Sequence, residues 1–209
     1  FTPKGRPATV RSSATHPSGG AQPKPQAFNM TRIHTVDPTS AEPELARILA
    51  AVRSPTGKTP HHLRVLANSK AALQAFLGLS VIADGGALSV ETRVRIALAI
   101  AQRLGNAHSL GFHTTVARQA GLTGNEIAAN REGASENARA AVALRLALSL
   151  SEHMGNINTA ELVEARLAGY TDADIVEIIT HVGMGQLIAM INKASGVEPD
   201  NTLGLHAGP

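Results

Sequence analysis

Cysteine is absent from the 209 residues, and aromatic residues are scarce, with four Phe, one Tyr and no Trp. Without thiols this chain cannot form disulfides, iron–sulfur clusters or Cys-ligated zinc sites, and it cannot perform thiol peroxidase chemistry. The scarcity of rings argues against base-stacking nucleic-acid platforms and aromatic carbohydrate troughs. No apolar run approaches the roughly 18–20 residues that a membrane span needs. We therefore expect a cytoplasmic protein that binds neither nucleic acid nor membrane.

The positive charge lies in the first 29 residues. The whole chain has a formal net charge of +3, yet residues 30–209 contain 15 basic and 16 acidic residues. Residues 1–29 contain four basic residues and no acidic one, and they are rich in Pro, Ser and Gly. This composition predicts a disordered basic tail with a weak electrostatic footprint and without the apolar segment of a secretory signal. Met30 resembles a natural start, which would make the tail an upstream extension.

From residue 39 onward the pattern is helical, rich in Ala and Leu, and lacks the period-two alternation of strands. Start signals for helices occur at Thr39 with Glu42, at Thr59-Pro60, at Ser89 and at Thr123 with Glu126. The sequence predicts an all-α domain of about eight or nine helices over residues 30–200, followed by a C-terminal arm at 201–209. The segment ENARAAVALRLALSLSEHM is apolar on most faces, so we expect it to be the central helix.

Two short motifs near residue 60 are weak. Gly57-Lys58-Thr59 is similar to the end of a phosphate-binding loop, but Val52 stands where the earlier glycine is required, and Pro60 follows. His61 and His62 begin a helix, where adjacent side chains point about 100° apart and chelate a metal poorly. We therefore predict no phosphate-binding loop and two solvent-exposed histidines.

The segment from Gly105 to His113 carries the candidate site. If a helix begins near Asn106, then Asn106, Ser109 and His113 fall at i, i+3 and i+7 on one face. His113 follows Ser109 by four residues, so imidazole and hydroxyl can approach hydrogen-bonding distance. His108 lies about 100° round the helix from Ser109 and faces a neighbouring element. The positive end of the helix dipole favours an anion or a developing oxyanion near these groups.

Five segments resemble, in order, the carboxymuconolactone decarboxylase and AhpD-like alkylhydroperoxidase superfamily. They are MTRIHTVDP, HHLRVLANSKAALQAFLGLS, ADGGALSVETRVRIALAIAQRLGN, HTTVARQAGLTGNEIAANREG and DADIVEIITHVGMGQLIAMINKASGVEPD. The resemblance spans Met30 to about Asp200 and implies an AhpD-like helical bundle. It also implies a symmetric homo-oligomer, a trimer or hexamer. Phe28, Phe76 and Phe112 are among the few large side chains available as interface anchors.

The redox branch of this superfamily carries a Glu and, after a fixed interval, Cys-x-x-Cys-x-x-x-His. Aligned on His113, the two cysteine positions hold Asn106 and Ser109, and the glutamate position holds Val94. His108 lies between the two cysteine positions, where some redox members carry His or Tyr. The resemblance thus implies a peroxidase-related protein, whereas the residues exclude the peroxidase activity, because serine leaves no reversible sulfenate-like state.

Cofactor-free acid–base chemistry is the first hypothesis that remains. The decarboxylase branch of the superfamily acts on small carboxylated lactones without a redox cysteine pair. Here His113 would be the general base or acid, with a pKa near neutrality, and Ser109 and Asn106 would donate hydrogen bonds to a substrate carboxylate or enolate oxygen. His108 would be a second titrating group. The candidate catalytic residues are therefore His113, Ser109, His108 and Asn106, and we expect neither a cofactor nor a metal.

Three other polar side chains are ambiguous in the sequence. His181 lies in an apolar helix, where it either reaches the site or is a hydrogen-bonded core histidine. Arg95 and Arg103 could clamp a substrate carboxylate, but arginines on a helix surface are ordinary. We therefore give these arginines little weight.

Two alternatives to acid–base chemistry stay open. His108, His113 and His181 could hold a zinc ion, but a five-residue spacing turns the first two about 140° apart, whereas the usual spacing is four. Alternatively, a degenerate family member could keep the oligomer and the pocket and only bind a ligand or partner. Replacement of the family's residues by Asn and Ser, not by Ala or Leu, argues mildly against this degeneration, because buried polar groups need partners.

Overall fold

The computed structural model describes residues 32–52 and 57–196, and within these ranges it contains nine α-helices and no strand. The chain divides into two units, Phe1–Met30 and Thr31–Pro209, and the described residues belong to the second. The all-α prediction is confirmed for this part of the chain. The predicted tail at 1–29 and the predicted arm at 201–209 lie outside the described residues, as does Phe28.

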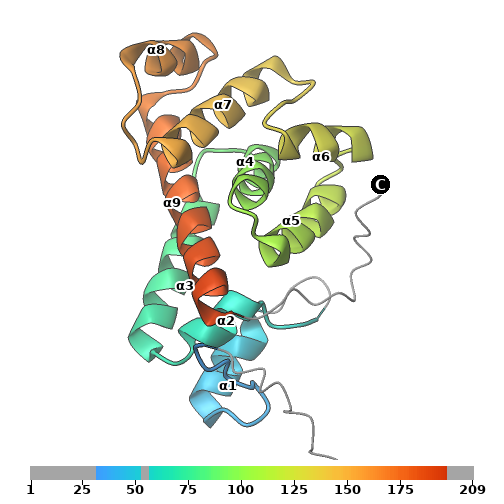
Figure 1. Ribbon diagram of the computed structural model, residues 1–209, viewed down its shortest axis with the longest axis vertical. Helices are drawn as coiled ribbons and strands as arrows, with labels where there is room; N and C mark the ends of the chain where they lie inside the picture. The colour runs from blue at the N-terminus through green and yellow to red at the C-terminus, as the bar shows by residue number, and fades with distance from the viewer. Residues whose placement is uncertain (1–31, 53–56, 197–209) are drawn as a thin grey trace, which may run out of the picture. The chain divides into compact units, whose positions relative to one another are not determined.

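The helices follow one another with short connections (Figure 1). They are α1 (Pro43–Ala51), α2 (His61–Leu66), α3 (Lys70–Asp84), α4 (Val90–Arg103), α5 (Ala107–Gln119), α6 (Gly124–Arg131), α7 (Ala138–Glu152), α8 (Thr159–Leu167) and α9 (Asp172–Ser195).

Helix α4 occupies the central position of the described helices. It packs against α5, α6, α7 and α9, which surround it in Figure 1. Six of its side chains are buried, because most of its circumference is covered: Val94, Ile96, Leu98, Ala99, Ile100 and Ala101. The prediction that the α7 segment is central is therefore wrong. Helix α7 packs on α4, α8 and α9, and Arg145 in its middle is exposed.

The apolar side chains form three clusters. Residues of α4, α7, α8 and α9 make the first, around Ile96, Ala147 and Ile178. Helices α1 to α3 make the second, which includes Phe76 with 6% of its surface exposed. Residues of α4, α5 and α6 make the third. Since Phe76 is a core residue, the prediction that it anchors an interface is wrong.

The predicted helix starts have mixed outcomes. Ser89 caps α4 as expected, because its Oγ accepts a hydrogen bond from the backbone N–H of Thr92 at 3.2 Å. Thr39 instead donates to Asp37 at 2.9 Å, and α1 begins without a side-chain cap. Thr59 donates to a carbonyl of α1 at 3.3 Å, and α2 also begins without a side-chain cap.

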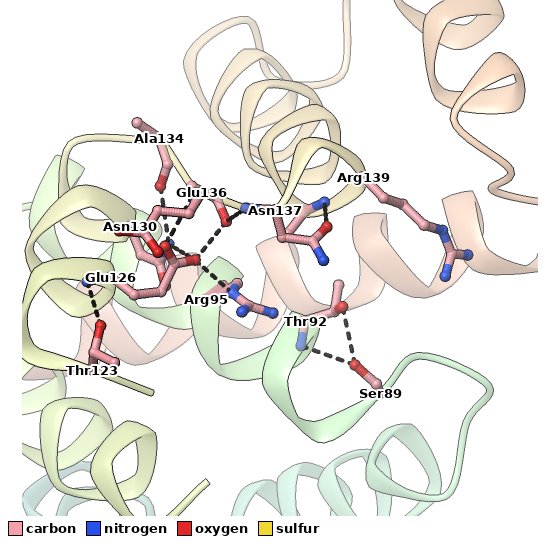
Figure 2. Close-up of polar contacts among 12 residues, drawn as sticks. Ser89, Thr92, Arg95, Thr123, Glu126, Asn130, Ala134, Glu136, Asn137 and Arg139 are labelled. Carbon is pink, nitrogen blue, oxygen red and sulfur yellow. Dashed lines mark hydrogen bonds and ion pairs between the residues drawn. The ribbon is translucent and has the colours of Figure 1, made fainter. Parts of the chain in front are cut away.

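Helix α6 begins with half of the predicted capping box. Thr123 accepts a hydrogen bond from the backbone N–H of Glu126 at 3.1 Å, but the Glu126 carboxylate points away from Thr123 (Figure 2). It accepts hydrogen bonds from four groups: Arg95 Nε at 3.0 Å, Asn130 Nδ2 at 3.0 Å, the backbone N–H of Glu136 at 3.0 Å, and Ser135 Oγ. Burial alone would raise the pKa of Glu126, and these hydrogen bonds lower it to about 2. This carboxylate therefore ties α4, α6 and the loop before α7 together.

From the sequence we expect no apolar run long enough to span a membrane, and helix α9 differs from that expectation. It has 24 residues and a window of mean hydropathy 1.4, so by length and composition it could cross a membrane. About a quarter of that window, 28%, is buried, including Ile178 and Val182 in the first core cluster. Four large apolar side chains on α9 are exposed: Val176, Ile179, Leu187 and Met190. Helix α9 thus has one face in the core and one apolar face that no described residue covers.

Candidate functional site

The first turn of α5 is built around the side chain of Asn106, its N-cap residue. Asn106 Oδ1 accepts a hydrogen bond from the backbone N–H of Ser109 at 3.3 Å, and Asn106 Nδ2 donates to Ser109 Oγ at 2.8 Å. Both side chains are buried. The prediction that a helix begins here is confirmed. The predicted contact between Ser109 and His113 is wrong, because among the described residues the hydroxyl of Ser109 is paired with Asn106.

Helix α9 adds a third polar side chain, Asn192, which the sequence analysis missed. Its Nδ2 donates to Asn106 Oδ1 at 3.0 Å, and 5% of its surface is exposed. A signal was available, because Asn192 lies in the run 178–192, which contains no charged residue, and shares a helical face with the apolar Ile178. A buried amide in such a run needs a polar partner.

A cavity of about 70 Å³ lies between α4, α5 and α9. Its lining comprises Ala97, Ala101, Asn106, Ser109, His113, His181, Met184, Gly185 and Ile188. A Cβ atom on Gly185 would lie 2.8 Å from Cγ2 of Ile100, so glycine permits the close approach of α9 to α4. The cavity therefore unites three of the four predicted catalytic residues, and His181 as well.

Two partly buried histidines, His113 on α5 and His62 on α2, lie close enough for His113 to lower the pKa of His62. The prediction that His113 has a pKa near neutrality is wrong, because burial lowers its pKa to about 4. Burial, together with His113 and the other nearby imidazoles, lowers the pKa of His62 to about 3. The His62 ring meets the ring of Phe76 edge-on at 5.4 Å. Both histidines are therefore neutral at pH 7.

His108, the fourth predicted residue, does not line the cavity. Its ring stacks on that of His61 of α2, with 5.0 Å between ring centres. His61 Nε2 also lies 2.9 Å from Ser195 Oγ, and burial, then His108, lowers the pKa of His61 to about 4. The prediction that His61 and His62 are solvent-exposed is wrong, since α2 packs its first turn against α5 and α9.

The metal-site alternative finds no support in the structure. Within residues 32–52 and 57–196, no group of three His, Asp or Glu side chains is placed to hold a metal ion. His113 and His181 share the cavity, but His108 faces α2.

The hypothesis that Arg95 and Arg103 clamp a substrate carboxylate is wrong. Arg95 pairs with Glu126 at 3.0 Å, and Arg103 pairs with Glu152 at 2.8 Å. Val94, at the family's glutamate position, lies in the third core cluster and does not line the cavity.

Known proteins resemble the chain over the part that carries this site. Residues 67–149 match the sequence profile of the carboxymuconolactone decarboxylase family. The predicted family resemblance is confirmed. The matched segment contains Asn106, Ser109 and His113, and it ends before α9, so His181 and Asn192 lie outside it. No curated protein sequence matches the chain.

Solved structures give the same fold. An uncharacterized peroxidase-related protein from Silicibacter sp. TM1040 aligns with a TM-score of 0.68 and 21% identity, over 87% of this chain and 95% of that one. The structure described as an alkylhydroperoxidase AhpD core, an uncharacterized peroxidase-related protein from Ralstonia eutropha JMP134, aligns with a TM-score of 0.70 and 19% identity, over 84% and 95%. The carboxymuconolactone decarboxylase-like chain therefore has an AhpD-like fold without the thiols of a thiol peroxidase.

Proposed function

We propose that this chain performs cofactor-free proton transfer on a small carboxylated or lactone substrate in the cavity between α4, α5 and α9. The observation that carries the proposal is that Asn106, Ser109 and His113 line one cavity. A neutral imidazole can accept a proton, and buried donors can stabilise the oxyanion that forms. The chain would be cytoplasmic and would need neither cofactor nor metal.

His113 would remove a proton from the carbon next to the substrate carbonyl. The electron pair of that C–H bond moves onto the carbonyl oxygen, which receives a hydrogen bond from the hydroxyl of Ser109. Because the pKa of His113 is lowered to about 4, the imidazolium is a strong acid and returns the proton readily. Return to a different carbon isomerises the substrate. If a carboxylate leaves as CO₂ instead, the electron pair of the broken C–C bond forms the enolate, and the enolate takes its proton from solvent water, because the neutral His113 has received none.

Proton exchange with solvent tests this role. In D₂O, wild type should catalyse deuterium incorporation next to the carbonyl of small lactones, measured by ¹H NMR. His113→Ala should slow this exchange by about 10²- to 10⁴-fold, the usual contribution of a general base. The exposed His34 provides the matched control, since His34→Ala should exchange at the wild-type rate. Equal rates for wild type and His113→Ala would refute the proposal.

A second candidate is a catalytically inactive, oligomeric binding or scaffold protein. The exposed apolar face of α9 favours it, because such a face is typical of an interface between subunits. Ligand-induced thermal shifts separate the two candidates. A ligand at 100 times its dissociation constant stabilises a protein by about 2.7 kcal/mol. A thermal shift without deuterium exchange indicates a binding protein. The absence of a thermal shift with any lactone or carboxylate indicates a scaffold.

We further infer that the chain forms a homo-oligomer, a trimer or hexamer, through the exposed face of α9. Val176, Ile179, Leu187 and Met190 recur at helical spacing, and 36–62% of each residue's surface is exposed. No Asp, Glu, Lys or Arg occurs from residue 178 to 192. An uncharged apolar stripe suits a second copy of itself, because the cores of interfaces between identical subunits are depleted of charge.

A further inference from the structure

The cavity between α4, α5 and α9 has no charged side chain among its described lining residues. Burial lowers the pKa values of both His113 and His181, so both rings are neutral at pH 7. Arg93, Asp84 and Glu177 influence His181 from outside the lining. A carboxylate placed inside would lose its hydration without gaining a cationic partner, which disfavours its binding.

The hydrogen bonds around Ser109 determine whether its hydroxyl donates or accepts a hydrogen bond in the cavity. Asn106 Oδ1 accepts from the amide of Asn192 at 3.0 Å and from the Ser109 backbone at 3.3 Å, which orients the Asn106 amide. Asn106 Nδ2 therefore faces Ser109 Oγ and donates to it at 2.8 Å. Within residues 32–52 and 57–196 this hydroxyl oxygen acts as an acceptor. Its own hydrogen is left to donate to an acceptor atom in the cavity.

Helix α9 contributes a second polar group to the cavity lining, His181. His181 Nε2 is buried and has no hydrogen-bond partner among the described residues. The backbone carbonyl of Ala83 acts on the same ring as an acceptor that raises its pKa, and we assign this interaction to Nδ1, since Nε2 has no partner among the described residues. The proton of the neutral ring is thus assigned to Nδ1, which leaves a lone pair on Nε2.

We propose that this cavity binds an uncharged hydroxy-carbonyl compound about the size of one five-membered ring. Its carbonyl oxygen accepts a hydrogen bond from Ser109, and its own hydroxyl donates to Nε2 of His181. The proposal rests on the proposed function in taking this cavity as the working site. It narrows that function to isomerisation of a neutral ligand, because it excludes the carboxylated substrates.

Three related probes test the charge and the two hydrogen bonds. They are α-hydroxy-γ-butyrolactone, γ-butyrolactone, and 2,4-dihydroxybutanoate, the ring-opened anion of the first. Calorimetry at pH 7 should show the hydroxylactone binding about fivefold more tightly than γ-butyrolactone, the value of one neutral hydrogen bond. The anion should bind at least about tenfold more weakly than the hydroxylactone.

Two variants test which residue makes each hydrogen bond to the ligand. His181→Phe should weaken hydroxylactone binding to the level of γ-butyrolactone, while γ-butyrolactone binding stays unchanged. Ser109→Ala should weaken the binding of both lactones about fivefold. His34→Phe, the same substitution at an exposed position, should change neither. If His181→Phe does not fold, Ser109→Ala and the binding of the three probes to wild type still test the inference.

Several results would overturn the inference. It is wrong if the anion binds as tightly as the hydroxylactone, if the two lactones bind equally, or if neither binds. The binding and exchange experiments together distinguish failure of this inference from failure of the proposed function. Tight binding of the anion with exchange abolished in His113→Ala supports proton transfer and rejects the uncharged ligand. Binding of the hydroxylactone as expected, with no exchange in wild type, supports the uncharged ligand and rejects proton transfer.

Discussion

A single carboxylate, that of Glu126, joins α4, α6 and the loop before α7. Its partner Arg95 is also largely buried, with 14% of its side chain exposed. Glu126→Gln should therefore destabilise the protein by about 3 kcal/mol, because it leaves a buried guanidinium without its anion. Urea denaturation at pH 7 measures this loss. Glu132→Gln, at an exposed position next to α6, is the control and should cost less than about 0.5 kcal/mol.

The same variant should change how stability depends on acid. The pKa of Glu126 is about 2 in the folded protein, well below its ordinary value of 4.5. Its contribution is complete above pH 4.5 and is lost as the pH falls toward 2. Glu126→Gln should lack this part of the acid dependence. A wild-type loss of stability over this range that persists unchanged in Glu126→Gln would contradict the assignment.

Sequence periodicity predicted which residues of α5 share a face but not how their side chains pair. Helical geometry alone places Asn106, Ser109 and His113 together, and all three line the cavity. The orientation of the Asn106 amide depends on Asn192, which lies 86 residues further along the chain. A local pattern contains no information about such a distant partner. The predicted pair within the helix, Ser109 with His113, was also wrong, because the hydroxyl of Ser109 is paired with Asn106.

At the scale of elements, α2 carries neutral histidines against α5. Chiefly because of burial, His62 has a pKa of about 3 in the folded protein, well below its ordinary value of 6.5. Below pH 6.5, His62 is protonated in the unfolded chain but stays neutral in the folded protein. The free energy of unfolding therefore decreases as the pH falls. His61 and His113, with pKa values of about 4, add the same trend. Wild type should therefore lose stability steeply between pH 6.5 and about 4.

His62→Phe isolates one of these histidines and keeps the ring that contacts Phe76. Between pH 6 and 5 the variant should lose about 1.4 kcal/mol less stability than wild type, the value of one proton over one pH unit. Urea denaturation at pH 7.5, 6 and 5 measures the difference. His34→Phe removes an exposed histidine and should leave the wild-type slope. Parallel curves for wild type and His62→Phe would show that His62 is protonated in the folded protein.

The elements themselves were predictable where their signals are local. Ser89 and the glycines after α3 mark helix ends, because capping and backbone freedom act within a few residues. The burial of α2 was not predictable, since its six residues carry two histidines at the start and resemble a solvated turn. Contact with α5 and α9 decides their burial. Tertiary packing also gives the central place to α4 and not to the more apolar α7.

At the scale of the whole molecule, the exposed face of α9 predicts assembly. Wild type at micromolar concentration should have three or six times its monomer mass of 21.7 kDa in size-exclusion chromatography with light scattering. The double variant Ile179→Glu and Met190→Glu should be a monomer, because each glutamate would be buried without a partner in the interface. Both positions are exposed in the described chain, at 46% and 62%, so the monomer itself should stay folded.

Leu167→Glu provides the matched control on α8. Leu167 is more exposed than either α9 residue, at 85%, so it tests whether loss of any surface hydrophobic side chain disperses the assembly. This variant should keep the wild-type mass. A monomeric wild type, or an intact oligomer in the α9 double variant, would exclude an interface on this face. The double variant should also bind lactones as wild type does, since its two substituted positions do not line the cavity.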